Sequence, residues 1–311
     1  MKILCIDGGT TNTRVRLVIN GVIADTERSN IGSSNKDNSE LKKACRAMIG
    51  AILNRNGLTE GDIRFIMAAG MLTSELGLYC LPHSVLPAGA ADLAKAAKTV
   101  VLEEICPIPF VFTPGLKQAA VGGNMMRGEE AECFGLCSVC GIKGAAAVIL
   151  PGTHNKVILY ENGTITDIYS MMSGEVFAAL SAHTLLRHSF PDEMPNGFDG
   201  EALLLGAEEC REYGLTEAAL KVRSIEKGGG KSALWLKSYL SGAVLYCDIQ
   251  SMVKFCGERT ILLGGPKALK KQFAVLIPHY LPDNRLIEAK DEDGDTATTL
   301  GQIMIADLLN R

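Results

Sequence analysis

The chain has 311 residues, of which 47% are hydrophobic and 21% charged, an ordinary globular composition long enough for two domains. A formal net charge of -4 argues against a nucleic-acid partner, and the basic cluster Lys267, Lys270 and Lys271 is interpreted as a solvated helix face. No apolar stretch approaches the ~20 residues that span a bilayer, so no membrane is expected. Ten cysteines without a secretion signal predict reduced thiols and a cytoplasmic location.

The first half of the chain begins with three short strands. Asn20-Gly21 is typical of a tight hairpin turn, and the alternating apolar residues on both sides of it predict antiparallel strands. Apolar residues at helical spacing then predict a helix that Asp37, Asn38 or Ser39 caps. The predicted elements are strands over residues 3–7, 13–19, 22–26, 63–69 and 110–112, and helices over about 38–56 and 128–140.

The same order of elements restarts near residue 145. The predicted elements are strands over 145–150, 155–160, 164–169, 260–263 and 286–287, and helices over about 173–187, 198–213 and 232–255, from 267, and over 297–309. The segment Lys227–Lys231 contains three glycines and is predicted to be a flexible loop. Gly294-Asp295-Thr296 is predicted to cap the last helix.

The two halves match at a fixed offset of 142 residues. Thr11 then aligns with Thr153, Asn20-Gly21 with Asn162-Gly163, and Asp25 with Asp167. A matching turn inside a matching strand order indicates two copies of one β-β-β-α unit. We place the boundary between the two copies near Ile142 to Gly144.

Asp7–Arg14, with the sequence DGGTTNTR, forms the turn between the first two strands. Glycines let backbone N–H groups approach a phosphate, and threonine hydroxyls add donors. Asp7 at the end of a strand could hold Mg²⁺ through water. An ordinary Gly-Thr hairpin would have the same composition, and that alternative stays open at this point.

The second turn, Pro151–Lys156, offers similar donors without a carboxylate. If a pseudo-twofold axis relates the two halves, the two turns face each other and could hold a triphosphate in a cleft. Gly264-Gly265, at a strand-to-helix junction, suits close approach of the adenosine moiety.

With these features the chain resembles the superfamily of actin, sugar kinases and heat-shock ATPases, and within it the 2-dehydro-3-deoxygalactonokinases. The stretches that carry the resemblance are Ile6–Arg14, Met67–Met71, Thr113–Gly115, Met126–Glu130, Leu150–His154, Ser173–Glu175 and Gly294–Thr296. They extend along the whole chain, and the Arg-Gly-Glu-Glu and Pro-Gly-Thr-His blocks are the specific ones. The first block departs from the family, with Gly8 and Thr10 where other members carry Trp and Ser.

The resemblance implies an α/β protein of two ribonuclease-H-like lobes, each a βββαβαβα unit, with an ATP cleft between them. The lobes would be residues 1–142, with the first phosphate hairpin and the sugar-acid contacts, and residues 143–311, with the second hairpin and the adenosine site. The implied reaction is Mg-ATP-dependent phosphorylation of the terminal hydroxyl of a 2-dehydro-3-deoxy sugar acid, foremost 2-dehydro-3-deoxy-D-galactonate. The sugar-acid epimer and the subunit count stay open, with a homodimer among the alternatives.

Phosphoryl transfer requires a base near the attacking hydroxyl, and Glu129, with Glu130 second, is the candidate. Acidic residues also favour the first turn of any helix, which is the structural alternative. Arg127 is the leading candidate to bind the substrate carboxylate, because a guanidinium suits a planar, bidentate acceptor. Arg14 is expected to meet an ATP phosphate or to stabilise the hairpin.

The other candidate residues have these roles: Asp7, Gly9, Thr10, Thr11, Asn12, Gly152, Thr153, His154, Gly264 and Gly265 for Mg-ATP, with Asp7 as the metal ligand, and Gly70, Met71, Arg127 and Lys156 for the sugar acid. The other histidines, His83, His183, His188 and His279, lack a metal-ligand spacing and are interpreted as structural.

Cys133, Cys137 and Cys140 have the C-x3-C-x2-C spacing of an iron–sulfur loop. On a helix these positions share one face, so packing is the favoured interpretation. Two alternatives to a sugar-acid kinase remain, a kinase for another small sugar and a nucleotide-gated binding protein of the same fold without turnover.

Overall fold

A computed structural model describes residues 1–33 and 37–309 of the chain. The chain forms two compact units. The first contains Met1–Gly144, Tyr160–Ile168 and Glu292–Arg311, and the second contains Ala145–Leu159 and Tyr169–Asp291. The lobes expected at 1–142 and 143–311 stay a prediction, and the clustering of contacts groups the C-terminal segment with the first unit. Within the described ranges, no helix has the length and apolar character needed to cross a membrane.

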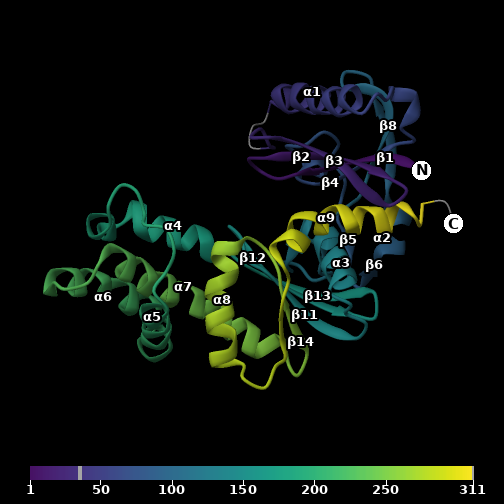
Figure 1. Cartoon of the computed structure of the whole chain (residues 1–311). Coiled ribbons are helices and arrows are strands. Elements are labelled where there is room, and N and C mark those ends of the chain that lie inside the picture. Colours follow the sequence, from purple (N-terminus) through teal and green to yellow (C-terminus); the bar gives the residue numbers. More distant parts are fainter. Residues whose placement is uncertain (34–36, 310–311) are drawn as a thin grey trace. The chain divides into compact units, whose positions relative to one another are not determined.

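The first unit is built on a six-stranded sheet with the order β3-β2-β1-β4-β8-β7 (Figure 1). A smaller sheet has the order β10-β9-β5. The elements up to α3 are β1 (Lys2–Gly8), β2 (Thr13–Ile19), β3 (Val22–Ser29), α1 (Ser39–Arg55), a 3-10 turn (Glu60–Asp62), β4 (Ile66–Gly70), a second 3-10 turn (Met71–Thr73), β5 (Ser84–Val85), β6 (Ala88–Gly89), α2 (Ala90–Ala96), β7 (Lys98–Leu102), β8 (Cys106–Phe112), β9 (Leu116–Lys117), β10 (Met125–Met126) and α3 (Glu129–Val139).

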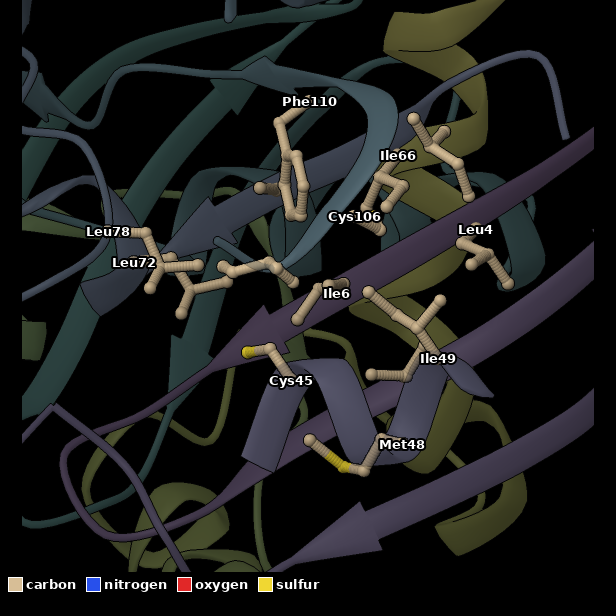
Figure 2. Packing of buried hydrophobic residues seen from close by; sticks show 14 of the residues in the cluster. Leu4, Ile6, Cys45, Met48, Ile49, Ile66, Leu72, Leu78, Cys106 and Phe110 are labelled. Atoms are coloured by element: carbon tan, nitrogen blue, oxygen red, sulfur yellow. The ribbon is translucent and has the colours of Figure 1, made fainter. Parts of the chain in front are cut away.

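Successive side chains of β1 point to opposite faces of this sheet and meet different neighbours there. Leu4 and Ile6 point to the face that α1 covers, and Figure 2 shows Ile49 of α1 directed at both of them. On the other face, Asp7 pairs in register with Arg14 of β2. This pair of charged residues lies at the end of β1, where the first predicted phosphate hairpin begins.

The second six-stranded sheet has the order β15-β14-β11-β12-β13-β6. The second unit contains β11, β14 and β15 of this sheet, whereas residues 160–168 at the end of β12 and in β13 belong to the first unit, as does β6. Figure 1 shows helices α4 to α8 of the second unit. The elements from residue 145 onward are β11 (Ala145–Leu150), β12 (Asn155–Glu161), β13 (Thr164–Met171), α4 (Ser173–His183), a 3-10 helix (Leu185–Ser189), α5 (Gly200–Tyr213), α6 (Leu215–Gly228), α7 (Ala233–Phe255), β14 (Thr260–Leu263), α8 (Lys267–Tyr280), β15 (Leu286–Glu288) and α9 (Asp291–Ala306).

The duplicated pattern is confirmed in the backbone. Strand order β3-β2-β1-β4-β8 in one sheet corresponds to β13-β12-β11-β14-β15 in the other, and β1–β4 and β11–β14 are both parallel pairs. Asn20 and Asn162 both have the rare left-handed conformation, with φ of 51° and 50°. Two open α/β sheets of the same order form the ribonuclease-H-like architecture that the sequence predicts.

Several local predictions were wrong. Helix α9 begins at Asp291, so Gly294-Asp295-Thr296 lies inside the helix and does not cap it. Helix α6 continues to Gly228, where the sequence suggested a loop from Lys227. Lys270 is 5% exposed, and its Nζ donates to Ala289 O and Asp291 Oδ1 at 2.7 and 2.6 Å, so it does not belong to a solvated face. For Lys270 a tertiary contact outweighed the local composition signal.

Candidate active site

The tip of the first hairpin, between β1 and β2, is held by backbone contacts. The Gly9 N–H donates to Asn12 O at 2.8 Å, and Gly9 O accepts from the Ser33 N–H at 3.0 Å. A methyl group placed on Gly32 would lie 2.5 Å from the carbonyl carbon of Thr10, so only glycine allows this approach. Thr10, Thr11 and Asn12 are exposed, so their polar groups can reach a ligand.

Asp7 lies where β1 ends, beside the end of β4. A methyl group on Gly70 would lie 2.6 Å from Gly8 O and 3.5 Å from Asp7 Oδ1, which shows how tightly these two strand ends meet. Burial raises the pKa of Asp7, and the charges of Glu129 and Asp295 raise it further, while Arg14 and Arg16 oppose the shift. Asp7, the expected metal ligand, therefore lies close enough to Glu129, the expected base, for the two carboxylates to repel each other.

Helix α3 begins at this same place. Its N-cap residue, Gly128, has φ of 109°, and a methyl group there would lie 3.0 Å from Gly70 Cα. Glu129 Oε2 accepts from the Arg127 N–H at 2.9 Å. Glu130 is 1% exposed, and burial, with a contribution from Glu129, raises its pKa to about 8. Glu129 is thus the more accessible of the two candidate bases.

Glu132 is a group that the sequence analysis missed. Burial and the charges of Asp7 and Glu129 raise its pKa to about 8. Asp7, Glu129 and Glu132 form an acidic cluster at the end of β1 and the start of α3. The sequence could have indicated this residue, because Glu129 and Glu132 are three positions apart and therefore lie on the same face of a helix.

The guanidinium of Arg127 contacts the segment that follows β4. Nη1 donates to Thr73 O at 2.6 Å and to Thr73 Oγ1 at 2.5 Å, and Nη2 donates to Leu81 O at 2.9 Å. Nη2 also lies 3.2 Å from His83 Nδ1, and burial together with Arg127 lowers the pKa of His83 to about 4. Arg127 therefore joins the start of α3 to the segment after β4, and its contact with a substrate carboxylate stays a prediction.

Arginines from β2 and β3 gather on one carboxylate of α9. Arg16, which is 1% exposed, donates through Nη1 to Thr299 Oγ1 at 2.8 Å and approaches Asp295 Oδ2 at 3.1 Å. Arg14 and Arg28 also pair with Asp295, at 3.4 and 2.9 Å. Arg14 therefore joins β2 to α9 by this ion pair, and both of its expected roles, a contact with ATP and stabilisation of the hairpin, stay predictions.

A pocket of about 390 Å³ opens beside the first hairpin. Its lining combines hairpin residues with the end of β3, and it consists of Asp7, Gly9, Asn12, Thr13, Arg14, Arg28, Ser29 and Asn30. Gly8 packs against Leu72, whose Cδ2 would lie 2.6 Å from an added methyl group, so a side chain at this position would displace Leu72.

The second hairpin, between β11 and β12, is held by a side chain instead of the backbone alone. The Gly152 N–H donates to Asn155 Oδ1 at 2.7 Å. Asn155 Nδ2 donates to Asp248 Oδ2 at 2.5 Å, and Asp248 is fully buried in α7. His154 Nε2 lies 2.7 Å from Glu175 Oε1 at the hairpin surface. Thr153 is exposed and so can reach a ligand.

A pocket of about 440 Å³ lies next to this hairpin. Its polar end is formed by the hairpin and the start of α4, and its apolar walls come from α4, α7 and α8. The lining residues are Gly152, Thr153, Asn155, Ser173, Gly174, Glu175, Phe177, Ala178, Lys237, Ser241, Val244, Leu245, Ala268, Leu269 and Gln272. A polar end joined to an apolar end suits a molecule with a phosphate chain and a flat ring.

The glycine pair expected at adenosine lies close to the second hairpin. The Gly264 N–H donates to Ile149 O at 2.9 Å, and a methyl group on Gly265 would lie 2.8 Å from Pro151 O. Gly265 has φ of 76°, so its backbone also requires glycine. Lys156 is 5% exposed within β12, and its predicted ligand contact is not tested. The sequence analysis missed the helical walls of the pocket, because apolar residues on α7 and α8 have the pattern of an ordinary core.

The cysteine cluster is helical. Cys133 and Cys137 are buried on α3, and Cys140 is its C-cap residue. A methyl group on Gly135 would lie 1.9 Å from Ala297 O, so α3 and α9 touch through their backbones and small side chains. This is the packing arrangement that the sequence analysis favoured. The described part of the chain contains no group of three or more His, Cys, Asp or Glu side chains suited to a metal ion.

Comparisons with known proteins add to this geometry. Residues 7–303 match the family model described as 2-keto-3-deoxy-galactonokinase. A 2-dehydro-3-deoxygalactonokinase from Escherichia coli (strain K12) is 25% identical over 256 residues, which cover 81% of this chain and 80% of that protein. A protein of Rhizobium meliloti (strain 1021), named a probable 2-dehydro-3-deoxygalactonokinase, is 26% identical over 62% of this chain, and the match spans only 63% of its own length.

Solved structures agree on the fold. A Sinorhizobium meliloti protein provisionally described as a 2-dehydro-3-deoxygalactonokinase has a TM-score of 0.80 at 20% identity, covering 98% of this chain and 95% of that one. The activator of 2-hydroxyisocaproyl-CoA dehydratase from Clostridium difficile, solved with bound ADPNP, has a TM-score of 0.54 at 10% identity, covering 100% and 96%. At such identities the likeness concerns the fold alone.

Proposed function

The chain belongs to the 2-keto-3-deoxy-galactonokinase family, with the fold of a sugar kinase, and we propose that it uses ATP to phosphorylate the terminal hydroxyl of 2-dehydro-3-deoxy-D-galactonate. The observation that carries this proposal is the family match over residues 7–303, which includes both predicted phosphate hairpins. The pocket beside the second hairpin supports it, because its polar and apolar ends suit a nucleotide.

The adenosine moiety of ATP is assigned to the pocket of the second unit. Phe177, Val244 and Leu269 supply apolar surface for a base, while Gly152 and Thr153 lie at the polar end. Gly264-Gly265 supports the hairpin from behind through its close approach to Pro151. A nucleotide bound here would have its phosphates at the hairpin tip, where Thr153 is exposed.

The first unit supplies the acidic chemistry. Asp7 would hold Mg²⁺ through water, and the neighbouring carboxyl groups of Glu129 and Glu132 make the site attractive to a hard cation. Mg²⁺ commonly uses one or two carboxylates together with phosphate oxygens, so a three-residue protein site is not required. When bound, the ion neutralises charge on the phosphates.

We assign the proton transfer to Glu129. Its carboxylate would accept the proton of the substrate hydroxyl as the oxygen attacks the γ-phosphorus, and ADP would leave. Glu130 is buried in the protein, whereas Glu129 is partly exposed. Arg127, Lys156 and the backbone at Gly70 and Met71 are the proposed sugar-acid contacts, and Gly70 lies next to the Asp7 carboxylate.

A panel of 2-keto sugar acids and neutral sugars in a coupled ADP-release assay tests the proposal. We expect 2-dehydro-3-deoxy-D-galactonate to give the highest kcat/KM, with release of ADP that depends on the sugar acid. A neutral sugar as the best substrate would assign another kinase activity to this fold. Tight ATP binding with no turnover of any substrate would instead indicate a nucleotide-gated binding protein.

A further inference from the structure

A buried carboxylate lies directly behind the nucleotide pocket and belongs to none of the groups assigned so far. Asp248 is on α7, fully buried, and its two oxygens accept hydrogen bonds from Asn155 and Ser173, both of which line the pocket. We propose that Asp248 is a positioning residue that fixes the phosphate end of the nucleotide pocket by holding the second hairpin and the start of α4 together. This inference rests on the proposed function, because the ligand is taken to be ATP.

The first link runs through the amide of Asn155. Its Nδ2 donates to Asp248 Oδ2 at 2.5 Å, which leaves Oδ1 to accept from the Gly152 N–H at 2.7 Å. A carboxylate accepts hydrogen bonds and so favours the amide orientation with Nδ2 facing it. Asp248 thereby fixes the orientation of Asn155, and Asn155 fixes the backbone of the hairpin at Gly152.

The second link runs to the first residue of α4. Ser173 Oγ donates to Asp248 Oδ1. The next residue, Gly174, approaches the hairpin so closely that a methyl group there would lie 2.7 Å from Thr153 O and 2.8 Å from Gly152 O. The two elements at the polar end of the pocket are therefore attached to one carboxylate, and a small shift of either would change the positions of their donors.

Burying the Asp248 carboxylate among apolar side chains costs free energy, which indicates that Asp248 does more than stabilise the core. Burial raises the pKa of Asp248 to about 6, although the bonds from Ser173 and Asn155 oppose that shift. Buried apolar residues flank it on α7, among them Val244, Leu245 and Ile249. An apolar side chain would fill such a position without the desolvation of an acid, so an acid here is expected to serve the site.

The test compares ligands of different phosphate number in matched variants. We expect Asp248→Ala to weaken ATP binding by about tenfold or more in calorimetric titrations, because the donors of the hairpin lose their fixed geometry. Binding of adenosine should change by less than about threefold, because the apolar walls remain. Asp248→Asn should retain most of the affinity, since its amide can still accept from Asn155 and donate to Ser173 Oγ.

Ser238→Ala is the control on the same helix. Ser238 is 1% exposed, accepts from the Asp199 N–H at 2.8 Å and does not line the pocket, so its loss should lower thermal stability without changing ATP affinity. If Asp248→Ala is too unstable to purify, Ser173→Ala removes one of the two links and should weaken ATP binding by about threefold.

An unchanged ATP affinity in Asp248→Ala would overturn the inference, and so would an equal loss for ATP and adenosine. Failure of the proposed function gives a different result, because the wild-type protein would then bind ATP weakly or fail to turn over a sugar acid. Wild-type ATP binding without turnover leaves this comparison valid.

Discussion

Glu130 turns back onto the start of its own helix, and its two carboxylate oxygens lie 2.9 and 2.8 Å from the backbone nitrogen of Gly128. Glu129 accepts in the same way from the N–H of Arg127. Two consecutive acids therefore meet two consecutive backbone donors before α3, but only Glu130 is buried. Of the two candidate bases, Glu130 is therefore buried against its own helix start, and Glu129 is the more accessible.

Replacement of Glu129 by Gln should lower kcat by about a hundredfold or more, because an amide cannot accept the hydroxyl proton. ATP should bind with unchanged affinity. Steady-state kinetics with the preferred sugar acid, together with titration of ATP, measure the two effects separately. Near-normal turnover in this variant would move the base to Glu130 or Glu132.

The buried Glu130 predicts a pH dependence of stability. Its pKa rises from an ordinary 4.5 to about 8 in the folded protein, so between these values the folded state binds more protons than the unfolded state. Its contribution to stability is therefore present at low pH and is lost as the pH rises through about 8. Urea unfolding between pH 5 and 9 should show a smaller decline in Glu130→Gln than in the wild-type protein. Parallel profiles would contradict the shift.

Arg127→Ala should raise KM for the sugar acid at least about tenfold and leave KM for ATP nearly unchanged, because the proposed contact between the guanidinium and the substrate carboxylate is lost. The control is Thr73→Val, which removes the Oγ1 acceptor at 2.5 Å from Nη1 together with the hydroxyl donor to Gly70 O at 3.1 Å, and leaves the guanidinium in place. We expect less than a threefold change in this control. Equal effects in the two variants would mean that Arg127 acts by holding the segment after β4.

Gly174→Ala should weaken the productive binding of ATP, because the new methyl group would lie 2.7 Å from Thr153 O and displace the hairpin tip. We expect KM for ATP to rise by about tenfold. Gly200→Ala, at the first position of α5, meets no atom within 4 Å and serves as the matched control. A Gly174→Ala protein with wild-type KM would show that the hairpin position is not critical.

Asp7→Asn should reduce activity sharply at ordinary Mg²⁺ concentrations, because the carboxylate that would hold the hydrated ion is lost. Titration of Mg²⁺ at saturating ATP measures the effect, and excess Mg²⁺ should restore part of the activity. A variant with the Mg²⁺ dependence of the wild-type protein would reject the metal role of Asp7.

The repeat, the hairpins and the family could be predicted from the sequence because each depends on short segments. Asn20-Gly21 and Asn162-Gly163 readily adopt the left-handed backbone that a tight hairpin turn needs, and this preference does not depend on distant parts of the chain. Glycines and hydroxyls at a strand end indicate phosphate chemistry for a similarly local reason. The α/β fold and the family that followed from these signals are confirmed.

Tertiary structure decided the partners of the charged and polar groups. Nothing near Asp248 in sequence indicates that its oxygens meet Asn155 and Ser173, 93 and 75 residues away. Likewise Arg16 binds Thr299 across 283 positions, and Lys270 is buried against Asp291. The local hydrophobic pattern of the sequence predicts which residues face a core, because burial follows the period of a helix or strand. The partner of a buried charge cannot be predicted in this way, because it depends on which distant segment packs against that charge.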